Sequence, residues 1–506
     1  MVQNEFQTEA YRNWSMGWGW SINQESHPPV VTNSIGATHP VPNSSHEWAS
    51  IFAEAPGPSE LLWQVSLNYL VPLSKENPEY ATEALESFYE AFWNARGDLR
   101  RRLGSSWDHC SSLRLKTLCA LNGSAEHALC DAAERLLQRE IAAENYWSQI
   151  ALNNHGLMLV DALVSVALTL SEPTESFKRS AGELSRILEF VFGEDGFCNE
   201  NSPAYHYLYI RLLREISSKY DAWPQCSELV QIARKYLKLA ETTMGQVVTQ
   251  DGKIPPLGDS NPASSEFRGP EGTYFSERVG LWIYKHDGVF LSFKCGFESV
   301  THKHADDTSI TLNYRGEDLI VDAGTANFNY RDKKILGLRT QKGHSGVYFP
   351  KFDEVHPAKM YGVDGYGAKS ALVTATERTA RGGYLVSGNF VAHRHVVVAS
   401  PTRIRVEDHT SSIRPARSLV RFIVPAEVDV IQERVGFRLI AEKSEARVRF
   451  NQRVRTTITR GQEVAPYKGW ISVRPNETTE ANCIEISRPL WRRGVLSHTI
   501  DLMPTS

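Results

Sequence analysis

The sequence lacks several features that would point to particular classes of protein. Its 506 residues contain no C-x-x-C pair, and its seven cysteines are widely spaced. It also lacks any stretch of about 18 uninterrupted apolar residues, the length that spans a membrane. The 55 Lys and Arg residues against 59 Asp and Glu give a formal charge of −4, without a long run of one sign. We therefore expect reduced, mostly buried cysteines, no membrane span and no nucleic-acid partner.

The N-terminal segment shows no pattern of an export signal. Glu5 and Glu9 stand where such a signal has a basic start and an apolar run. On this ground we expect a cytoplasmic protein, or a periplasmic or secreted one if a leader has been removed. The sequence leaves the oligomeric state open, with a homodimer as one option.

The length of the chain predicts more than one domain, because single hydrophobic cores rarely grow so large. Residues 1–58 are rich in Pro, Asn, Ser and His and predict an irregular lead-in. In residues 59–265 apolar side chains recur at helical spacing, as at Leu85, Phe88 and Phe92. Residues 275–506 alternate and are rich in β-branched side chains, which predicts an antiparallel β-sandwich. The expected fold class is α+β multidomain.

The first candidate motif is N-N-H-G at residues 153–156, at the start of a predicted apolar helix. Asn154 and His155 would offer an amide, an imidazole and free backbone N–H groups, a combination suited to a carboxylate. The plainer alternative is helix capping, with the Asn as N-cap and the His as a surface residue.

The second motif is the polar loop G-F-C-N-E-N-S-P-A-Y-H-Y at residues 196–207. Ser202 as N-cap and Pro203 at the first helical position would place Tyr205 and His206 in the first turn. A phenol with its usual pKa near 10 is protonated at neutral pH and can act as a general acid. The alternative is that the tyrosines here are core aromatics. Glu200 either binds a substrate or caps the helix.

The third motif contains His302 and His304, which share one face if the chain is extended. A hairpin can bring Asp322 back beside His304, and His344 follows downstream. This His/Asp/His set suits zinc or a similar divalent ion. Its spacing is too open to be specific, and solvated loop histidines explain it equally well.

Taken together and in this order, the motifs resemble those of the heparinase II/III-like polysaccharide lyases, which include alginate and heparan sulfate lyases. The resemblance rests on N-N-H-G, on DGFCNENSPAYH and on the H-x-H-A-D-x-x-S-x-x-L-x-Y-x-G-x-x-L-I-x-D-x-G pattern that begins at His302. The segments PPLGDS and HRHVVVAS also look similar. The family implies an N-terminal (α/α)-toroid of helical hairpins followed by a C-terminal antiparallel β-sandwich.

The resemblance also implies an activity. Such an enzyme cleaves a uronic-acid polysaccharide or oligosaccharide by β-elimination and leaves a 4,5-unsaturated uronate end. The expected substrate is a glycosaminoglycan such as heparan, hyaluronan or chondroitin, or alginate. Since the whole chain carries a formal charge of −4, attraction to such a substrate must come from a local basic region, which favours low sulfation.

Residue roles follow by motif match. Asn154, aided by His155, would neutralise the uronate carboxylate, and Tyr205 would be the catalytic acid. His302 and Tyr330 are both candidates for the base. Glu200, His206 and Arg339 are candidates for substrate contacts. The family further implies a structural zinc ion held by His304, Asp322 and His344.

Two other functions remain open from the sequence. A glycoside hydrolase on the same toroid would need two carboxyl groups facing each other, and Glu200 with Asp259 could supply them. A non-catalytic carbohydrate-binding protein could keep the fold without turnover.

Overall fold

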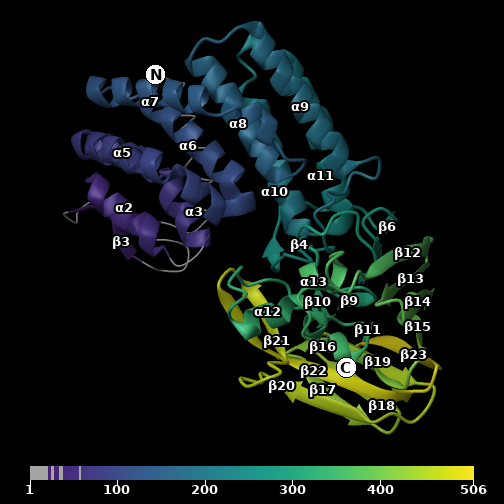
Figure 1. Cartoon of the computed structure of the whole chain (residues 1–506). Coiled ribbons are helices and arrows are strands. Elements are labelled where there is room, and N and C mark those ends of the chain that lie inside the picture. The colour runs from purple at the N-terminus through teal and green to yellow at the C-terminus, as the bar shows by residue number, and fades with distance from the viewer. Residues whose placement is uncertain (1–20, 24–27, 33–37, 56–57, 506) are drawn as a thin grey trace. The chain divides into compact units, whose positions relative to one another are not determined.

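The structure is a computed structural model that describes residues 21–23, 28–32, 38–55 and 58–505. The chain divides into two compact units (Figure 1). Unit 1 comprises Met1–Phe190 and Arg211–Leu237, and unit 2 comprises Val191–Ile210 and Lys238–Ser506. The domain limits predicted at residues 58, 265 and 275 stay predictions. The loop with Glu200 and Tyr205 nevertheless groups with the unit that holds the β-strands, although it lies within the helical half of the sequence.

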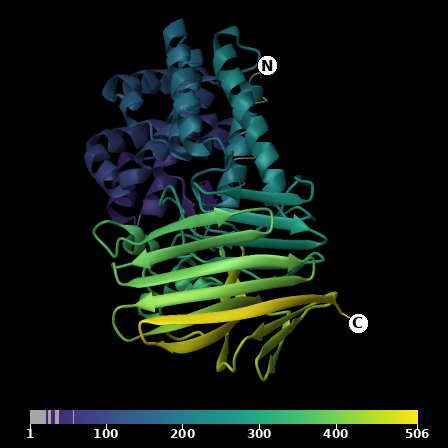
Figure 2. The same cartoon turned by 90° about the vertical axis from the view of Figure 1, so that its right-hand side faces the viewer.

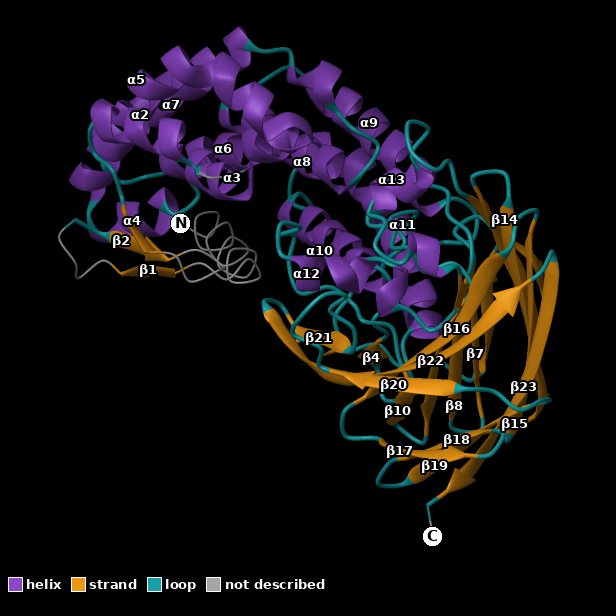
Figure 3. Ribbon diagram, turned by 60° about the horizontal axis from the view of Figure 1, so that its bottom comes forward, coloured by secondary structure: helices purple, strands orange, loops and turns teal. Residues whose placement is uncertain are grey.

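Most of unit 1 is helical, as Figure 3 shows in purple. The helices before residue 250 are α2 (Ser45–Glu54), α3 (Pro58–Ser66), α4 (Leu70–Glu76), α5 (Pro78–Leu103), α6 (Trp107–Asn122), α7 (His127–Ala143), α8 (Asn154–Thr169), α9 (Thr174–Phe192), α10 (Pro203–Lys219) and α11 (Ser227–Val247). The last three continue from unit 1 into unit 2 or back.

The described part of the predicted lead-in is more regular than expected. It holds α2 and the antiparallel strands β1 (Ser21–Asn23), β2 (Val30–Thr32) and β3 (Thr38–Pro40). Ser44 caps α2 by accepting a hydrogen bond from the Glu47 N–H, which is a local start signal that composition alone does not show. Residues 1–20, 24–27, 33–37 and 56–57, on which the prediction also fell, lie outside the described residues.

Helix α5 shows why this part of the sequence is helical. The Asn77 side chain accepts a hydrogen bond from the Tyr80 N–H, and Pro78 occupies the first turn. Leu85, Phe88 and Phe92 recur on one face and are fully buried. This face packs against α2, α4 and α7, so burial of the apolar stripe stabilises the helix within the unit.

The strands of unit 2 form three larger antiparallel sheets. A five-stranded sheet has the order β10-β9-β8-β7-β6, with β6 (Gly272–Ser276), β7 (Leu281–His286), β8 (Val289–Lys294), β9 (Ser309–Tyr314) and β10 (Glu317–Ile320). A second has the order β11-β16-β22-β20, with β21 paired to β22; these are β11 (Val347–Tyr348), β16 (Ala416–Pro425), β20 (Thr456–Arg460), β21 (Trp470–Arg474) and β22 (Glu477–Leu490).

The largest sheet has eight strands in the order β12-β13-β14-β15-β23-β19-β18-β17, and Figure 2 shows its strands side by side, with β23 in yellow. Its members are β12 (Lys369–Ala375), β13 (Thr379–Val386), β14 (Phe390–Ser400), β15 (Arg403–Ser412), β17 (Asp429–Glu433), β18 (Gly436–Ile440), β19 (Ser444–Phe450) and β23 (Arg493–Pro504). The remaining elements of unit 2 are β4 (Lys253–Ile254), β5 (Ala263–Ser264), α12 (Lys333–Arg339) and α13 (Pro357–Tyr361).

One hydrophobic core joins these sheets. Along β15 the buried Ile404 and Val406 alternate with the exposed Arg403 and Arg405, so one face points inward and the other to solvent. Inward side chains from all three sheets form a continuous cluster, which explains why the alternating sequence gives an antiparallel β-domain. All seven cysteines are free and six of them are buried, as predicted. Among the described helices, none combines the length and apolarity needed to cross a membrane.

Candidate active site

In unit 2 the structure brings Tyr205 and His302 into direct contact. Tyr205 lies in the first turn of α10, where Ser202 Oγ accepts a hydrogen bond from its N–H. The tyrosine ring stacks on the imidazole of His302 with centroids 3.5 Å apart and planes 24° apart. Burial raises the pKa of Tyr205 well above its usual value, and the Asp259 and Glu200 carboxylates add to the rise. The phenol is therefore protonated at neutral pH.

Asp259 holds both histidines of the H-x-H motif. Its Oδ2 lies 2.7 Å from His302 Nδ1, and its Oδ1 lies 2.8 Å from His304 Nε2. Burial acts to raise the pKa of Asp259, but Arg339 and the two imidazoles outweigh it and hold that pKa well below its usual value. The charged carboxylate fixes the orientation of both rings. Sequence reasoning considered Asp259 only as a hydrolase carboxylate and missed this role.

The backbone around His302 is built for this geometry. His302 has a φ of 55°, a left-handed conformation that is uncommon for a residue other than glycine. The Asn201 side-chain amide donates to the Ser299 and Thr301 carbonyls at 2.7 and 3.0 Å, which holds the segment just before His302. Gly258 also has a positive φ, and a Cβ there would lie 2.5 Å from the Asn201 carbonyl oxygen. The loop with Asp259 can approach this segment only with glycine at that position.

A buried charge cluster holds residues 303–307, which directly follow His302. Lys303 is fully buried and pairs with Asp306 and with Asp307, the latter at 3.2 Å. Asp307 also accepts hydrogen bonds from the Gly296 N–H and the Tyr361 hydroxyl. These bonds tie residues 303–307 to the segment that follows β8 and to α13, which fixes the backbone beside the two histidines.

Arg339 and Tyr330 are linked to the Tyr205–His302 pair through Asp259. Arg339 Nη2 lies 3.2 Å from Asp259 Oδ2, and its guanidinium lies 4.9 Å from the centroid of the Tyr330 ring. Arg339 is only 7% exposed, which favours a role in holding Asp259 over the predicted contact with substrate. Tyr330 is thus connected to His302 through Arg339 and Asp259.

The structure around His206 and Glu200 does not support the predicted contacts of these two residues with substrate. His206 is fully buried, its ring stacks on Phe197, its Nδ1 accepts from the Cys198 N–H, and its Nε2 donates to the Ala240 carbonyl. Burial lowers its pKa to about 4, so it is a neutral core residue and the prediction of substrate binding is wrong.

Glu200 is also buried, at 1% exposure. Its Oε1 accepts from the Tyr209 hydroxyl at 2.5 Å, and its Oε2 lies 3.4 Å from His302 Nε2. The carboxylate therefore faces His302, and the predicted contact with substrate is not supported by its burial.

Asn154 and His155 lie in unit 1, at the start of α8. Asn153 is the N-cap, because its Oδ1 accepts from the Gly156 N–H at 3.2 Å. The capping alternative thus applies to Asn153, and Asn154 is the first residue of the helix. His155 Nδ1 lies 3.1 Å from Asp108 Oδ1, and its ring stacks on His109 at 4.8 Å, so its orientation is fixed.

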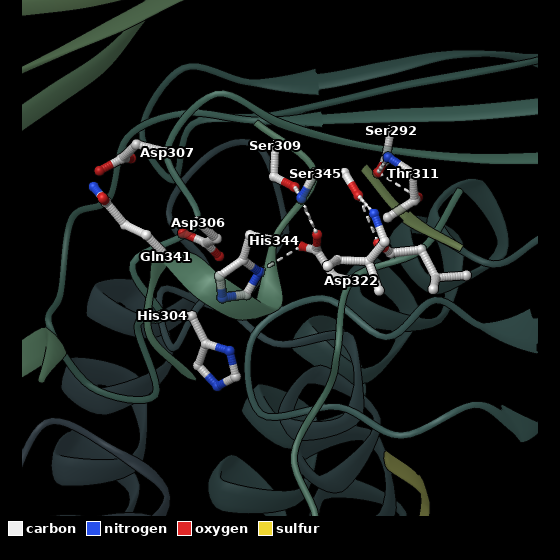
Figure 4. Close-up of polar contacts among 12 residues, drawn as sticks. Ser292, His304, Asp306, Asp307, Ser309, Thr311, Asp322, Gln341, His344 and Ser345 are labelled. Atoms are coloured by element: carbon white, nitrogen blue, oxygen red, sulfur yellow. Dashed lines mark hydrogen bonds and ion pairs between the residues drawn. The ribbon is translucent and has the colours of Figure 1, made fainter. Parts of the chain in front are cut away.

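The three predicted metal ligands lie together in unit 2 (Figure 4). The rings of His304 and His344 are 5.3 Å apart, and His344 Nδ1 lies 3.1 Å from Asp322 Oδ2. Both histidines are fully buried, and His304 Nδ1 and His344 Nε2 have no hydrogen-bond partner among the described residues. Residue types and unpartnered atoms fit a cation. In the side-chain positions shown, however, no group of three or more His, Cys, Asp or Glu residues in the described part of the chain is gathered closely enough to hold one.

Comparison with known structures identifies the fold. Heparan sulfate lyase HepC from Pedobacter heparinus is 14% identical, with a TM-score of 0.59 over 88% of this chain and 76% of that one. A structure of heparinase III is 13% identical, with a TM-score of 0.63 over 87% and 77%. Chondroitinase AC lyase is 9% identical, with a TM-score of 0.54 over 88% and 75%. The likeness is one of fold, and it confirms the predicted helical toroid followed by an antiparallel β-domain.

Part of unit 2 also matches a family model in sequence. Residues 269–490 match the family model described as "Heparinase II/III-like, C-terminal". This stretch of unit 2 is therefore similar to the C-terminal domain of the heparinase II/III-like proteins, in agreement with the resemblance that the motifs predicted. No curated protein matches the chain in sequence.

Proposed function

We propose that the protein is a lyase that cleaves uronic-acid glycans by β-elimination. The single observation that carries the proposal is the stacked Tyr205–His302 pair, with His302 held by Asp259. A protonated phenol beside an oriented imidazole supplies an acid and a base within a few ångströms of each other. The heparinase II/III-like match of residues 269–490 and the fold shared with heparinase III support the same reaction class.

The proposed reaction uses the chain's own side chains. His302 gives its Nδ1 proton to the hydrogen bond with Asp259, so Nε2 of the neutral ring can accept the C5 proton of the uronate. Glu200, 3.4 Å from Nε2, then stabilises the imidazolium. Tyr205 protonates O4 as the C4–O4 bond breaks and the C4=C5 double bond forms. We prefer His302 to Tyr330 as base because the ring of Tyr205 stacks directly on His302, whereas Tyr330 is linked to His302 through Arg339 and through Phe328.

Asn154 and His155 are proposed to neutralise the uronate carboxylate. This step makes the C5 proton more acidic, since preorganised donors stabilise the charge that develops next to it. The buried Asn154 amide at a helix N-terminus and the imidazole fixed by Asp108 have the chemistry required. Their assignment rests on the motif and on this local geometry within unit 1.

The proposed substrate is a glycosaminoglycan of low sulfation, with alginate as the alternative. A panel of hyaluronan, chondroitin, heparan sulfate and alginate, followed by the ultraviolet absorbance of the unsaturated uronate, tests both reaction and substrate. If reducing ends are released without this absorbance, the protein is a hydrolase and the lyase proposal is wrong. The hydrolase is disfavoured because Glu200 and Asp259 are both buried and Asp259 is hydrogen-bonded to two histidines.

We further propose that His304, Asp322 and His344 hold a divalent cation, with zinc as the first choice. Their unpartnered buried atoms support this, as does the carboxylate–histidine bond from Asp259 to His304, a common feature around metal ligands. When bound, the ion would stabilise the loops that carry these three residues. Elemental analysis of metal-free preparations reloaded with zinc, together with the melting temperature, tests the site. A His344→Ala variant should lose both the bound metal and the thermal shift on zinc addition, and an unmodified protein that binds no ion would remove the proposal.

A further inference from the structure

A rim of arginines surrounds an exposed tryptophan at one end of the eight-stranded sheet. The rim consists of Ile413, Arg414, Arg417, Arg488, Trp491, Arg492 and Arg493. Trp491 is 74% exposed and Ile413 73% exposed. Both stretches of the sequence that supply the rim, residues 410–419 and 486–495, contain no Asp or Glu.

Two turns place these residues side by side. The β15–β16 turn carries Ile413 and Arg414, and the β22–β23 turn carries Trp491 and Arg492. The Ser412 N–H donates to the Arg492 carbonyl at 2.9 Å, which joins the two turns directly. Strand pairing continues the contact on both sides, with Arg493 opposite Ser411 and Arg417 opposite Pro489. Both turns pass between the eight-stranded sheet and the sheet of β16 and β22.

The charges of the rim are not neutralised locally. Arg414, Arg417, Arg492 and Arg493 are exposed and make no ion pair with any residue in the described part of the chain. Arg488 donates to the Val495 carbonyl at 2.6 Å and keeps its charge. Five arginines thus lie on two turns and strand ends that are joined by backbone pairing, on a chain whose formal charge is −4. Such a local field attracts an anionic ligand that the whole molecule would repel.

The outer face of the sheet extends this surface along β23. Arg493, Val495, Ser497 and Thr499 point outward, in alternation with the buried Leu496 and Ile500. At about 3.3 Å per residue, Arg493 and Thr499 are roughly 20 Å apart. Beyond Val495 the face is hollowed to about 400 Å³, with Arg405, Glu407, Arg449, Ser497 and Thr499 in its lining. The Ser497 hydroxyl donates to Glu407 at 3.4 Å and Arg449 pairs with Asp501, so among the described residues Arg405 supplies the unpaired positive charge of the hollow. Arg405 is exposed and has no ion-pair partner among the described residues.

We propose that the rim and this hollow form one track that binds an acidic polysaccharide chain outside the catalytic centre. The proposal rests on the proposed function for its substrate class. A row of guanidinium groups matches carboxylates or sulfates repeated along a chain, and the indole face of Trp491 matches the C–H face of a sugar ring. The hydroxyl groups of Ser497 and Thr499 suit a polyhydroxylated ligand. The track would hold a long substrate during repeated cleavage.

An anionic membrane is the other ligand that arginines and a tryptophan can bind. It would need an apolar surface flanked by cations in one plane, whereas here polar residues continue from the rim into a hollow along the strand. The geometry therefore favours an extended soluble chain.

The test uses the full chain with Tyr205→Phe, so that binding is measured without turnover. Heparan sulfate and hyaluronan, each as long chains and as tetrasaccharides, are titrated against three variants: Trp491→Ala, Arg414→Ala/Arg493→Ala and Arg405→Ala. The control is Arg378→Ala/Lys443→Ala, which removes two exposed cations at the other ends of the strands. We expect the double arginine variant to bind long chains roughly three- to tenfold more weakly, with a weaker dependence on salt.

Trp491→Ala should weaken long-chain binding to a similar degree, and Arg405→Ala less. The control should bind like the parent, and tetrasaccharide binding should change less than long-chain binding in every variant. Unchanged long-chain affinity in all three variants would overturn the track. So would tighter binding to phosphatidylserine vesicles than to either polysaccharide, with the same dependence on Arg414 and Arg493. Failure of the proposed function would give a different result: the protein with Tyr205 intact would form no unsaturated product from any of the polymers.

Discussion

Both units bury carboxylates beside cations and tyrosines, but they use them differently. In unit 1, Glu140 is fully buried and accepts hydrogen bonds from Arg114 and Tyr89 at 3.0 and 2.9 Å, and from Tyr146. The Arg114 guanidinium is covered by the Phe92 ring at 4.6 Å. In unit 2, Asp259 is equally buried, yet the His302 side chain that it holds is 18% exposed. A buried carboxylate and its partners have a structural role where all the side chains are buried. They can take part in catalysis where one of these side chains is exposed to solvent.

The largest effect is expected for Tyr205→Phe. Removal of the hydroxyl leaves no acid for O4, so the rate of unsaturated product formation should fall about 10³-fold or more, while the fold is kept. Initial rates by ultraviolet absorbance and the melting temperature measure both. The matched control is Tyr207→Phe on the same helix, whose hydroxyl donates to Glu266 at 2.8 Å. Equal activity of the two variants would remove Tyr205 from the mechanism.

Glu140→Gln tests the structural side of the comparison. It leaves the charge of the buried Arg114 without its carboxylate, so the free energy of unfolding should fall by about 3 kcal/mol. Turnover per folded molecule should stay unchanged at temperatures where the variant is folded. Urea unfolding and single-temperature kinetics measure the two quantities. A large loss of turnover in fully folded protein would show that the two clusters are not separate in function.

Asp259→Asn should reduce kcat roughly 10- to 100-fold with a smaller change in KM. The amide keeps the shape of the carboxylate but cannot accept from both imidazoles and neutralise them. The pH profile of kcat should also change, which a purely structural role would not produce. Asp318→Asn is a suitable control, because it makes the same carboxylate-to-amide change in unit 2 at a residue that accepts from the Asn313 side chain at 2.8 Å.

The smallest effect is expected for the stability of the protein at acidic pH. Burial acts to raise the pKa of Glu140, but Arg114 outweighs it and the pKa lies below the usual carboxyl value. A lowered folded-state pKa means that Glu140 contributes stability above the pKa of the unfolded chain, and that this contribution is lost as pH falls through the folded-state pKa. The stability difference between the parent and Glu140→Gln should therefore shrink below about pH 4. Urea titrations at several pH values measure it, and a difference that grows on acidification would contradict the assignment.

The sequence predicted the elements of the fold and the residues of the site better than their partners. Apolar periodicity identified the helices and strands because it reports which face is buried. The local signals Ser202 and Pro203 also predicted that Tyr205 lies in a first helical turn. Asp259 was missed as the partner of His302 because nothing local links a loop residue to a histidine 43 positions later.

His206 shows a second limit. A histidine in the first turn after a polar loop looks exposed in sequence, and only the packing of Phe197 and the Ala240 carbonyl around it makes it a core residue. Glu200 and Arg339 were likewise predicted to contact substrate, but burial turns both towards Asp259 or His302. The rim around Trp491 escaped notice because its two halves are far apart in the chain and meet only through the pairing of β16 with β22 and of β15 with β23.

The hold of Asn201 on the segment before His302 has a practical consequence for protein engineering. Its side-chain N–H bonds to the Ser299 and Thr301 carbonyls span 98 and 100 positions of the sequence, and its side-chain Oδ1 accepts from Lys294 Nζ at 3.3 Å. Grafting residues 302–306 into another β-sandwich would transfer the histidines without the contact that aims them. A transplant that is to work as a unit must carry the Asn201 loop and the Gly258–Asp259 loop as well.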